Sequence, residues 1–174
     1  MRIEPITGDK LFIREHVLDD SDAYTDWQCD PDVGEFLSWL PRIENEAFQS
    51  LKDAIEQQYI ENRRRFFMAV VRREDKKVVG DVGITLLNDQ TGSIGWFIRK
   101  RYWGKGCAGE AAALMINCGF TKIGLNTIGA SCRRENTISE RIMRRCGFRL
   151  FDTTERRLNY TLRYEDWNLK SANQ

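Results

Sequence analysis

Apolar residues recur at every second position along some stretches of the chain and at every third or fourth position along others. The first spacing predicts β-strands and the second predicts amphipathic helices. The predicted strands are residues 10–15, 66–72, 78–87, 93–99, 127–132, 149–153 and 158–164. The predicted helices are residues 19–29, 44–63, 110–120 and 137–146. Because consecutive strands precede strand–helix–strand units, we expect an α+β fold with one mixed sheet of about seven strands flanked by about four helices.

The ends of the predicted helices carry signals of their own. Arg63–Arg65 would place positive charge at the C-terminal end of the helix predicted over 44–63, where the helix dipole favours it. Asn136 is a suitable N-cap for the last helix, and Gly147 followed by Phe148 is typical of a left-handed helix stop. The predicted inner face of this last helix is Ile138, Ile142 and Cys146.

Length and composition indicate one globular domain. The 174 residues are 41% hydrophobic and 30% charged, and the formal net charge at pH 7 is +1. A chain of this size needs no disulfide or metal to fold, and no global positive charge argues for nucleic-acid binding. No apolar stretch approaches the roughly 18 residues of a membrane helix, and no signal-peptide pattern follows Met1. We therefore expect a cytoplasmic protein without nucleic-acid or membrane partners.

The five cysteines and the single histidine offer little for metal or nucleophilic chemistry. No C-x-x-C pair is present, and His16 has no second histidine to act with, so we expect no metal site. An odd number of cysteines fits reduced thiols in the cytosol. His16 follows the first predicted strand, and we interpret it as a structural residue at the strand end rather than as a catalyst.

Positive charge is concentrated in one part of the chain. Residues 99–149 contain eleven Lys and Arg against three Asp and Glu, so that the remainder of the chain is acidic. This asymmetry favours a polyanionic ligand on a restricted surface, although solvated charges alone would produce the same pattern. The motif inside this basic segment has to decide between the two interpretations.

A glycine-rich turn lies inside the basic segment, between a predicted strand and a predicted helix. Gly104, Gly106 and Gly109 would let backbone N–H groups approach a phosphate, and the helix N-terminus adds positive charge there. The spacing is not that of a Walker A loop. It does satisfy G-x-G-x-x-G, but no second mononucleotide-binding half follows and no acidic residue ends the next strand. Binding of a nicotinamide cofactor is therefore disfavoured.

Four segments, in the expected order, resemble the GNAT superfamily of N-acetyltransferases and in particular its RimJ/RimL-like branch. They are residues 10–14, the loop 101–108, residues 136–139 with 146–148, and residues 160–167. The loop is similar to the acyl-CoA pyrophosphate loop of that family, and residues 136–148 are similar to its N-x-x-S…G-F helix. The resemblance spans one domain, residues 8–168. It implies a sheet that splays in the middle, where acetyl-CoA enters as a co-substrate.

The resemblance also implies which residues hold the cofactor. In the family, backbone groups of the splayed strand bind the pantetheine arm, the glycine loop binds the pyrophosphate, and an asparagine contacts the arm. The matching residues are Phe97, Ile98, Arg99, Trp103, Gly104, Lys105, Gly106, Cys107, Ala108, Gly109 and Asn136. The cationic side chains expected near the phosphates are Arg99, Lys100, Arg101 and Lys105.

The catalytic residues match the family pattern only in part. Ser139 stands where other branches have a tyrosine that donates a hydrogen bond to the leaving thiolate. Ser93 aligns with a glutamate that is often taken as the general base, so the base stays open. The alternatives are Asp81, Asp89, Glu35 or a water relayed by Ser93. Cys107 at a helix N-terminus, where a thiol pKa falls, would permit an acyl-enzyme, but the family transfers the acyl group directly.

The predicted function is transfer of an acetyl group from acetyl-CoA to a primary amine by direct attack in a ternary complex. The amine is either a protein N-terminus or a small molecule, and residues 30–42, which would border its pocket, carry no readable code. An acyl-CoA-binding sensor without activity is the alternative, because the expected glutamate is absent. The sequence also leaves open whether the protein forms a homodimer.

Overall fold

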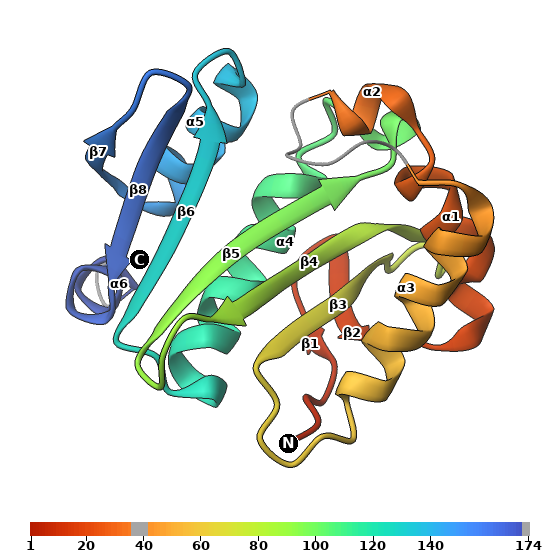
Figure 1. Cartoon of the computed structure of the whole chain (residues 1–174). Coiled ribbons are helices and arrows are strands. Elements are labelled where there is room, and N and C mark those ends of the chain that lie inside the picture. The colour runs from red at the N-terminus through yellow and green to blue at the C-terminus, as the bar shows by residue number, and fades with distance from the viewer. Residues whose placement is uncertain (36–41, 172–174) are drawn as a thin grey trace.

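The computed structural model describes residues 1–35 and 42–171 of the chain, which form one mixed sheet with helices on both faces (Figure 1). The helices are α1 (Ser21–Gln28), α2 (Pro31–Gly34), α3 (Glu44–Gln57), α4 (Cys107–Cys118), α5 (Thr137–Cys146) and α6 (Tyr164–Ser171). The strands are β1 (Ile6–Thr7), β2 (Leu11–Glu15), β3 (Arg65–Arg72), β4 (Val78–Leu86), β5 (Thr91–Ile98), β6 (Thr127–Arg133), β7 (Arg149–Thr153) and β8 (Arg157–Arg163). Their order in the sheet is β1-β2-β3-β4-β5-β6-β8-β7, which confirms the predicted α+β fold.

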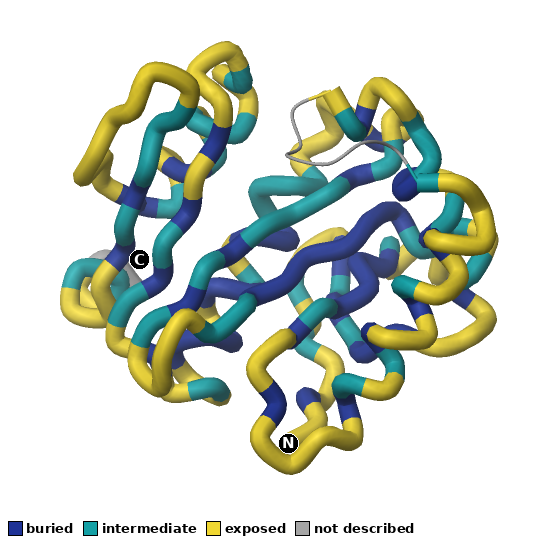
Figure 2. The backbone as a smooth tube through the Cα atoms, viewed as in Figure 1, coloured by how far each residue is buried: buried dark blue, intermediate teal, exposed yellow. Residues whose placement is uncertain are grey.

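Two helix layers cover the two faces of the sheet. α4 packs on one face over the larger apolar core, to which it contributes the fully buried Met115 and Ile116. α1 and α3 pack on the other face around a smaller cluster that includes Trp27 and Leu51. β3 and β4 run through the middle of the molecule and are buried along most of their length (Figure 2).

β5 and β6 are parallel neighbours that separate partway along their length. They pair only where Thr91–Ser93 lies beside Thr127–Gly129, and beyond these residues the two strands diverge (Figure 1). Each strand keeps its other neighbour, since β5 pairs with β4 up to Ile98 and β6 pairs with β8 up to Arg133. The splayed sheet that the resemblance implied is therefore present.

The helix predicted over 44–63 is shorter than expected. α3 ends at Gln57, so Arg63–Arg65 does not lie at its C-terminal end. Arg63 instead turns into the protein, where its guanidinium donates to both carboxylate oxygens of Glu15, at 2.5 and 3.0 Å. The prediction of positive charge at the C-terminal end of this helix was wrong. Arg63 forms a buried ion pair with β2, and the spacing of apolar residues along a helix does not reveal such a tertiary contact.

The last predicted helix has the expected ends but a different inner face. Asn136 Oδ1 accepts the Ser139 N–H at 2.9 Å, and Gly147 stops the helix at φ 96°. Met143 is 1% exposed and Ile138 is 66% exposed, so the prediction of Ile138 as an inner residue was wrong. The buried face is rotated toward Met143 because α5 packs along α4 rather than onto the sheet alone.

All five cysteines are free thiols. Within residues 1–35 and 42–171, no group of three or more His, Cys, Asp or Glu side chains is arranged to hold a metal ion. None of the helices in the described part of the chain combines the length and apolarity that a membrane span requires.

Candidate active site

The glycine-rich loop between β5 and α4 leaves open space above its backbone. Gly104 and Gly106 have φ angles of 73° and 80°, a left-handed conformation that glycine adopts without steric cost. A Cβ built on Gly104, Gly106 or Gly109 would meet no atom within 4 Å. Gly106 is also the N-cap of α4, so the first free N–H groups of that helix face the same space. The loop can therefore receive an anion close to its backbone.

Three of the four cationic side chains expected at the phosphates are held by carboxylates of α1 and α2. Arg99 Nε and Arg101 Nη2 both donate to Asp26 Oδ2, at 2.5 and 3.0 Å, and Lys100 forms an ion pair with Asp32. These contacts fasten the start of the loop to α1 and α2. Lys105 is different, since its ammonium lies 5.5 Å from the centre of the Tyr102 ring and points to no carboxylate among the described residues.

The strand β5 turns alternate backbone groups toward β4 and toward the gap. The Arg99 N–H donates to Val79 O at 2.9 Å, and Thr91 O accepts the Leu87 N–H at 2.8 Å. The backbone N–H and C=O groups of the odd-numbered residues therefore point to β4. The backbone groups of the even-numbered residues beyond Ser93 point to the gap between β5 and β6, and these residues are Ile94, Trp96 and Ile98. One acceptor is occupied, because Trp103 Nε1 donates to Ile98 O at 2.6 Å. The backbone groups of Phe97 and Arg99 thus point to β4, and those of Trp96 and Ile98 point to the gap.

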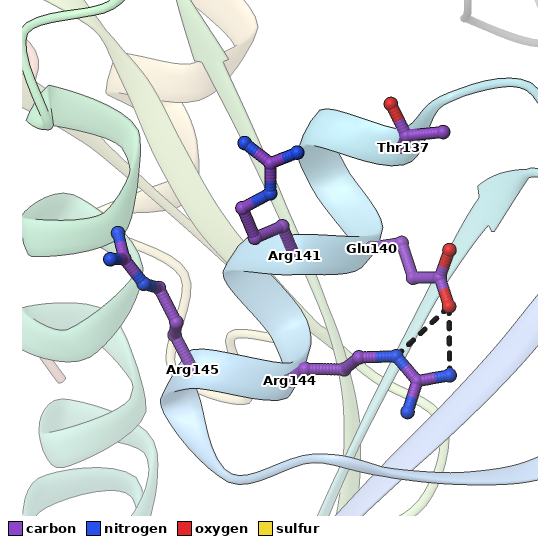
Figure 3. A pocket seen from close by; sticks show the side chains of 5 residues that line it. All are labelled: Thr137, Glu140, Arg141, Arg144 and Arg145. Carbon is purple, nitrogen blue, oxygen red and sulfur yellow. Dashed lines mark hydrogen bonds and ion pairs between the residues drawn. The ribbon is translucent and has the colours of Figure 1, made fainter.

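Beside α4, the helix α5 carries a shallow basic hollow of about 460 Å³ (Figure 3). It is lined by Thr137, Glu140, Arg141, Arg144 and Arg145. Arg144 turns to Glu140, with Nε 2.9 Å from Oε1, whereas Arg141 and Arg145 extend from the helix away from that pair. The hollow adds positive charge next to the helix that follows the glycine loop, which agrees with a polyanionic ligand.

Cys107 does not have the environment of a nucleophile. Burial and the neighbouring carboxylate of Glu110 raise the pKa of its thiol, although Cys107 is the first residue of α4. The expectation of a lowered thiol pKa is therefore wrong, because burial and Glu110 outweigh the backbone hydrogen bond and the charges of Lys105 and Arg72, which lower it. Cys107 serves as a small residue of the loop.

A second, deeper pocket of about 190 Å³ lies between α1, α3 and the sheet. Aromatic side chains form much of its wall: Trp27 stacks on Phe97 with ring centres 4.8 Å apart, and Tyr24 meets Trp27 edge-on at 5.2 Å. Two polar residues in its lining, Gln28 and Asp81, are 3% and 1% exposed. Because Asp81 pairs with Phe97 across β4 and β5, the pocket borders the strand that lines the gap.

Asp81 belongs to a chain of buried charges. His16 Nε2 donates to Asp81 Oδ2 at 2.6 Å, and His16 Nδ1 lies 3.4 Å from Asp20 Oδ2. Arg14 holds Asp20 through two hydrogen bonds, at 2.7 and 2.8 Å. Burial lowers the pKa of His16, but the hydrogen bonds and charges of Asp20 and Asp81 outweigh it and raise the pKa from 6.5 to about 9. His16 is therefore a cation at neutral pH.

Residues 10–149 match the family described as "Acetyltransferase (GNAT) domain". The chain belongs to the GNAT acetyltransferases. The uncharacterized N-acetyltransferase p20 of Bacillus licheniformis is 28% identical over 148 residues, which are 84% of this chain and 83% of p20. The fold is also that of a GNAT-family acetyltransferase from Bacillus anthracis, with a TM-score of 0.83, 23% identity and coverage of 93% and 99% of the two chains. RimL, a ribosomal L7/L12 alpha-N-protein acetyltransferase solved with coenzyme A, has a TM-score of 0.80, 13% identity and coverage of 92% and 98%.

Because the chain belongs to the GNAT family, its general chemistry is acetyl transfer from acetyl-CoA. The three carboxylates considered as the general base of this acetyltransferase differ in burial and position. Asp81 lines the pocket beside β5, whereas Glu35 is exposed after α2 and the side chain of Asp89 is 98% exposed in the β4–β5 turn. Ser93 lies where β5 and β6 last pair, at the closed end of the gap, and Ser139 is half-buried in the first turn of α5. Of residues 30–42, only 36–41 lie outside the described residues, and Arg42 lines the pocket.

Sequence reasoning missed Gln28 as a residue of the pocket lining, whereas His16 directly follows β2 and pairs with Asp81, in agreement with the structural role expected for it. Gln28 lies on α1 without any distinguishing neighbour in the sequence. The signal that marks Gln28 is its burial in the pocket that Asp81 also lines. A single sequence does not contain that signal.

Proposed function

We propose that this acetyltransferase transfers the acetyl group of acetyl-CoA to a primary amine by direct attack, with both substrates bound at once. The amine is a protein N-terminus or a small molecule. The observation that carries the proposal is the arrangement around β5: the glycine loop follows its end, the gap opens along its free edge, and the buried pocket meets its face at Phe97. Cofactor and acceptor would thus approach the same few residues from two directions.

The loop would hold the cofactor mainly through its backbone. Trp103–Gly109 would bind the pyrophosphate through N–H groups at the N-terminus of α4, with the ammonium of Lys105 as the added charge. The pantetheine arm would enter the gap and bind backbone groups of Trp96 and Ile98. Asn136 commits its Oδ1 to the cap, which leaves Nδ2 as its donor to the arm.

The reaction needs an aligned amine, a polarised thioester and a stabilised leaving group. The amine nitrogen forms a bond to the carbonyl carbon, the C–S bond breaks, and one proton passes from the nitrogen to the sulfur, so that the products are an amide and free CoA. We assign Ser139 as the hydrogen-bond donor to the departing thiolate. Ser93, at the closed end of the gap, is assigned to relay the proton through water. An α-amino acceptor, with a pKa of roughly 7.7–8.0, would need only a weak base.

The RimJ/RimL-like branch is part of the same proposal. The likeness to the RimL structure supports it at the level of the fold, and the N-x-x-S…G-F segment of residues 136–148 supports it at the level of the motif. A protein N-terminus is the acceptor that this branch would favour.

A direct experiment separates an enzyme from a sensor. Acetyl-CoA is incubated with a panel of amines and short peptides, CoA thiol release is followed, and acetylated products are identified by a mass increase of one acetyl group. Thiol release that depends on an added amine supports the proposal. If CoA protects the protein against thermal unfolding but no amine is acetylated, the sensor hypothesis is favoured. If NAD protects it and CoA does not, the enzyme and sensor hypotheses are both refuted.

A further inference from the structure

Two buried oxygens in the pocket between α1, α3 and the sheet lack a hydrogen-bond donor among the described residues. They are Asp81 Oδ1 and Gln28 Oε1, and both residues line the pocket. An acceptor buried without a donor is costly, and each such atom calls for a partner that the protein itself does not supply. Both atoms accept hydrogen bonds, so the missing partner is a donor.

The charges around Asp81 hold one of its oxygens and leave the other for a ligand. His16 binds Oδ2 at 2.6 Å, Asp20 lies on the far side of His16, and Arg14 binds Asp20. Two carboxylates thus alternate with two cationic groups, and Asp81, which is 1% exposed, has His16 as its partner. Its Oδ1 accepts no hydrogen bond from the described residues.

Tyr24, Trp27 and Phe97 give the pocket an aromatic wall. Trp27 and Phe97 stack at 4.8 Å with their planes 4° apart, and Tyr24 completes the wall next to His16. Because Trp27 and Phe97 stack on each other, each ring covers one face of the other. The charged residues of the lining are Asp53, Asp81, Arg42 and Arg65. The two unpartnered acceptors, rather than the net charge of the lining, therefore favour a ligand with several N–H donors.

We propose that this pocket binds the acceptor as a primary ammonium, whose N–H groups donate to Asp81 Oδ1 and Gln28 Oε1. An ammonium carries three donors and no acceptor, which matches a lining with two unsatisfied acceptors. The inference rests on the proposed function and names the form in which the acceptor is recognised. A cavity of about 190 Å³ takes a compact amine or the first residue of a chain. The ammonium is held at the face of β5 and gives up one proton to water, and the neutral amine then attacks the thioester carbon.

The test compares amines with alcohols of the same shape. Benzylamine and butylamine, both cations at pH 7, are titrated calorimetrically into the protein saturated with CoA, and benzyl alcohol and butanol serve as neutral counterparts. The proteins are the wild type, Asp81→Asn, Gln28→Leu and the matched control Asp53→Asn. Asp53 lines the same pocket but is exposed and already accepts a hydrogen bond from Gln49 at 2.9 Å.

We expect the wild type and Asp53→Asn to bind the amines at least about tenfold more tightly than the alcohols, as a charge-assisted hydrogen bond would produce. Asp81→Asn should reduce this ratio to within about twofold, and Gln28→Leu should reduce it in part. The ratio is measured within one protein, so a general loss of stability does not create the effect.

Three outcomes overturn the inference while CoA binding is intact. These are a wild type without preference for any amine, a preference that survives in Asp81→Asn, and an equal loss in Asp53→Asn. If Asp81→Asn does not fold, Gln28→Leu decides in the same way. Loss of CoA binding in the wild type would instead overturn the proposed function, so the two failures are distinguishable.

Discussion

Replacing Gly106 by alanine adds one methyl group at the point where the proposed phosphate approaches the loop. The added Cβ meets no protein atom within 4 Å, so the free protein has room for it. The backbone cost arises because Gly106 has a φ of 80°, and a left-handed alanine is disfavoured by roughly 1–2 kcal/mol. For a domain of this size, that cost lowers the Tm by about 2–4 °C for each kcal/mol.

Gly124 provides a matched control for this backbone cost. Its φ is 83°, and a Cβ built there also meets no atom within 4 Å. It is the C-cap of the π-helical segment Gly119–Ile123, which continues from the other end of α4, a helix about 18 Å long. Gly124→Ala should therefore destabilise the free protein as much as Gly106→Ala, without reaching the loop.

The assay is the thermal shift produced by CoA, followed by a titration of its Kd. At a CoA concentration of about a hundred times Kd, the stabilisation is about 2.7 kcal/mol, or roughly 5–10 °C in Tm. Gly124→Ala should keep this shift. Gly106→Ala should weaken CoA binding by about tenfold or more, because the methyl group holds the phosphate away from the N–H groups. An unchanged Kd in Gly106→Ala would refute the placement of the phosphate at this loop.

Three further predictions concern other parts of the molecule. Ser139→Ala should lower kcat by about ten- to a thousandfold at unchanged CoA affinity if Ser139 donates to the thiolate. Thr137 has an exposed hydroxyl at the start of the same helix, and Thr137→Ala should leave kcat unchanged. Equal kcat values in Ser139→Ala and the wild type would contradict the role of Ser139. The pKa of His16 is raised from 6.5 to about 9, so its contribution to stability is fully present below pH 6.5 and is lost as the pH rises through 9. In urea titrations the stability advantage of the wild type over His16→Gln should shrink by on the order of 3 kcal/mol over that window, and an advantage independent of pH would contradict it. Arg63→Met should lower the free energy of unfolding by about 3–5 kcal/mol because it leaves Glu15 buried without its cationic partner. Replacing the exposed neighbour, Arg64→Met, should change the free energy of unfolding by no more than about 0.5 kcal/mol. Similar losses in both variants would contradict a large contribution of the buried ion pair to stability.

The features that depend on near neighbours in the chain were predictable from the sequence. The spacing of apolar residues located seven of the eight strands and four of the six helices of the described residues, and it missed β1, α2 and α6. Asn136 and Gly147 marked the two ends of α5 as the structure has them. Gly104 and Gly106 indicated an open backbone next to a helix N-terminus, and both adopt left-handed conformations there. Caps, turns and strand alternation are decided within a few residues, so the sequence alone contains them.

The tertiary structure decided which of these residues meet and which are occupied elsewhere. Asp26 and Asp32 hold three of the four cations that the sequence offered to the phosphates. Asp81 became distinct from the other carboxylates only when β4 placed it beside His16. The pairing with β4 turned the backbone groups of Trp96, rather than those of Phe97, toward the gap, since the edge of a strand that stays unpaired depends on its neighbour strand. Such contacts join residues far apart in the chain, and only the packing of helices on the sheet brings them within reach of each other.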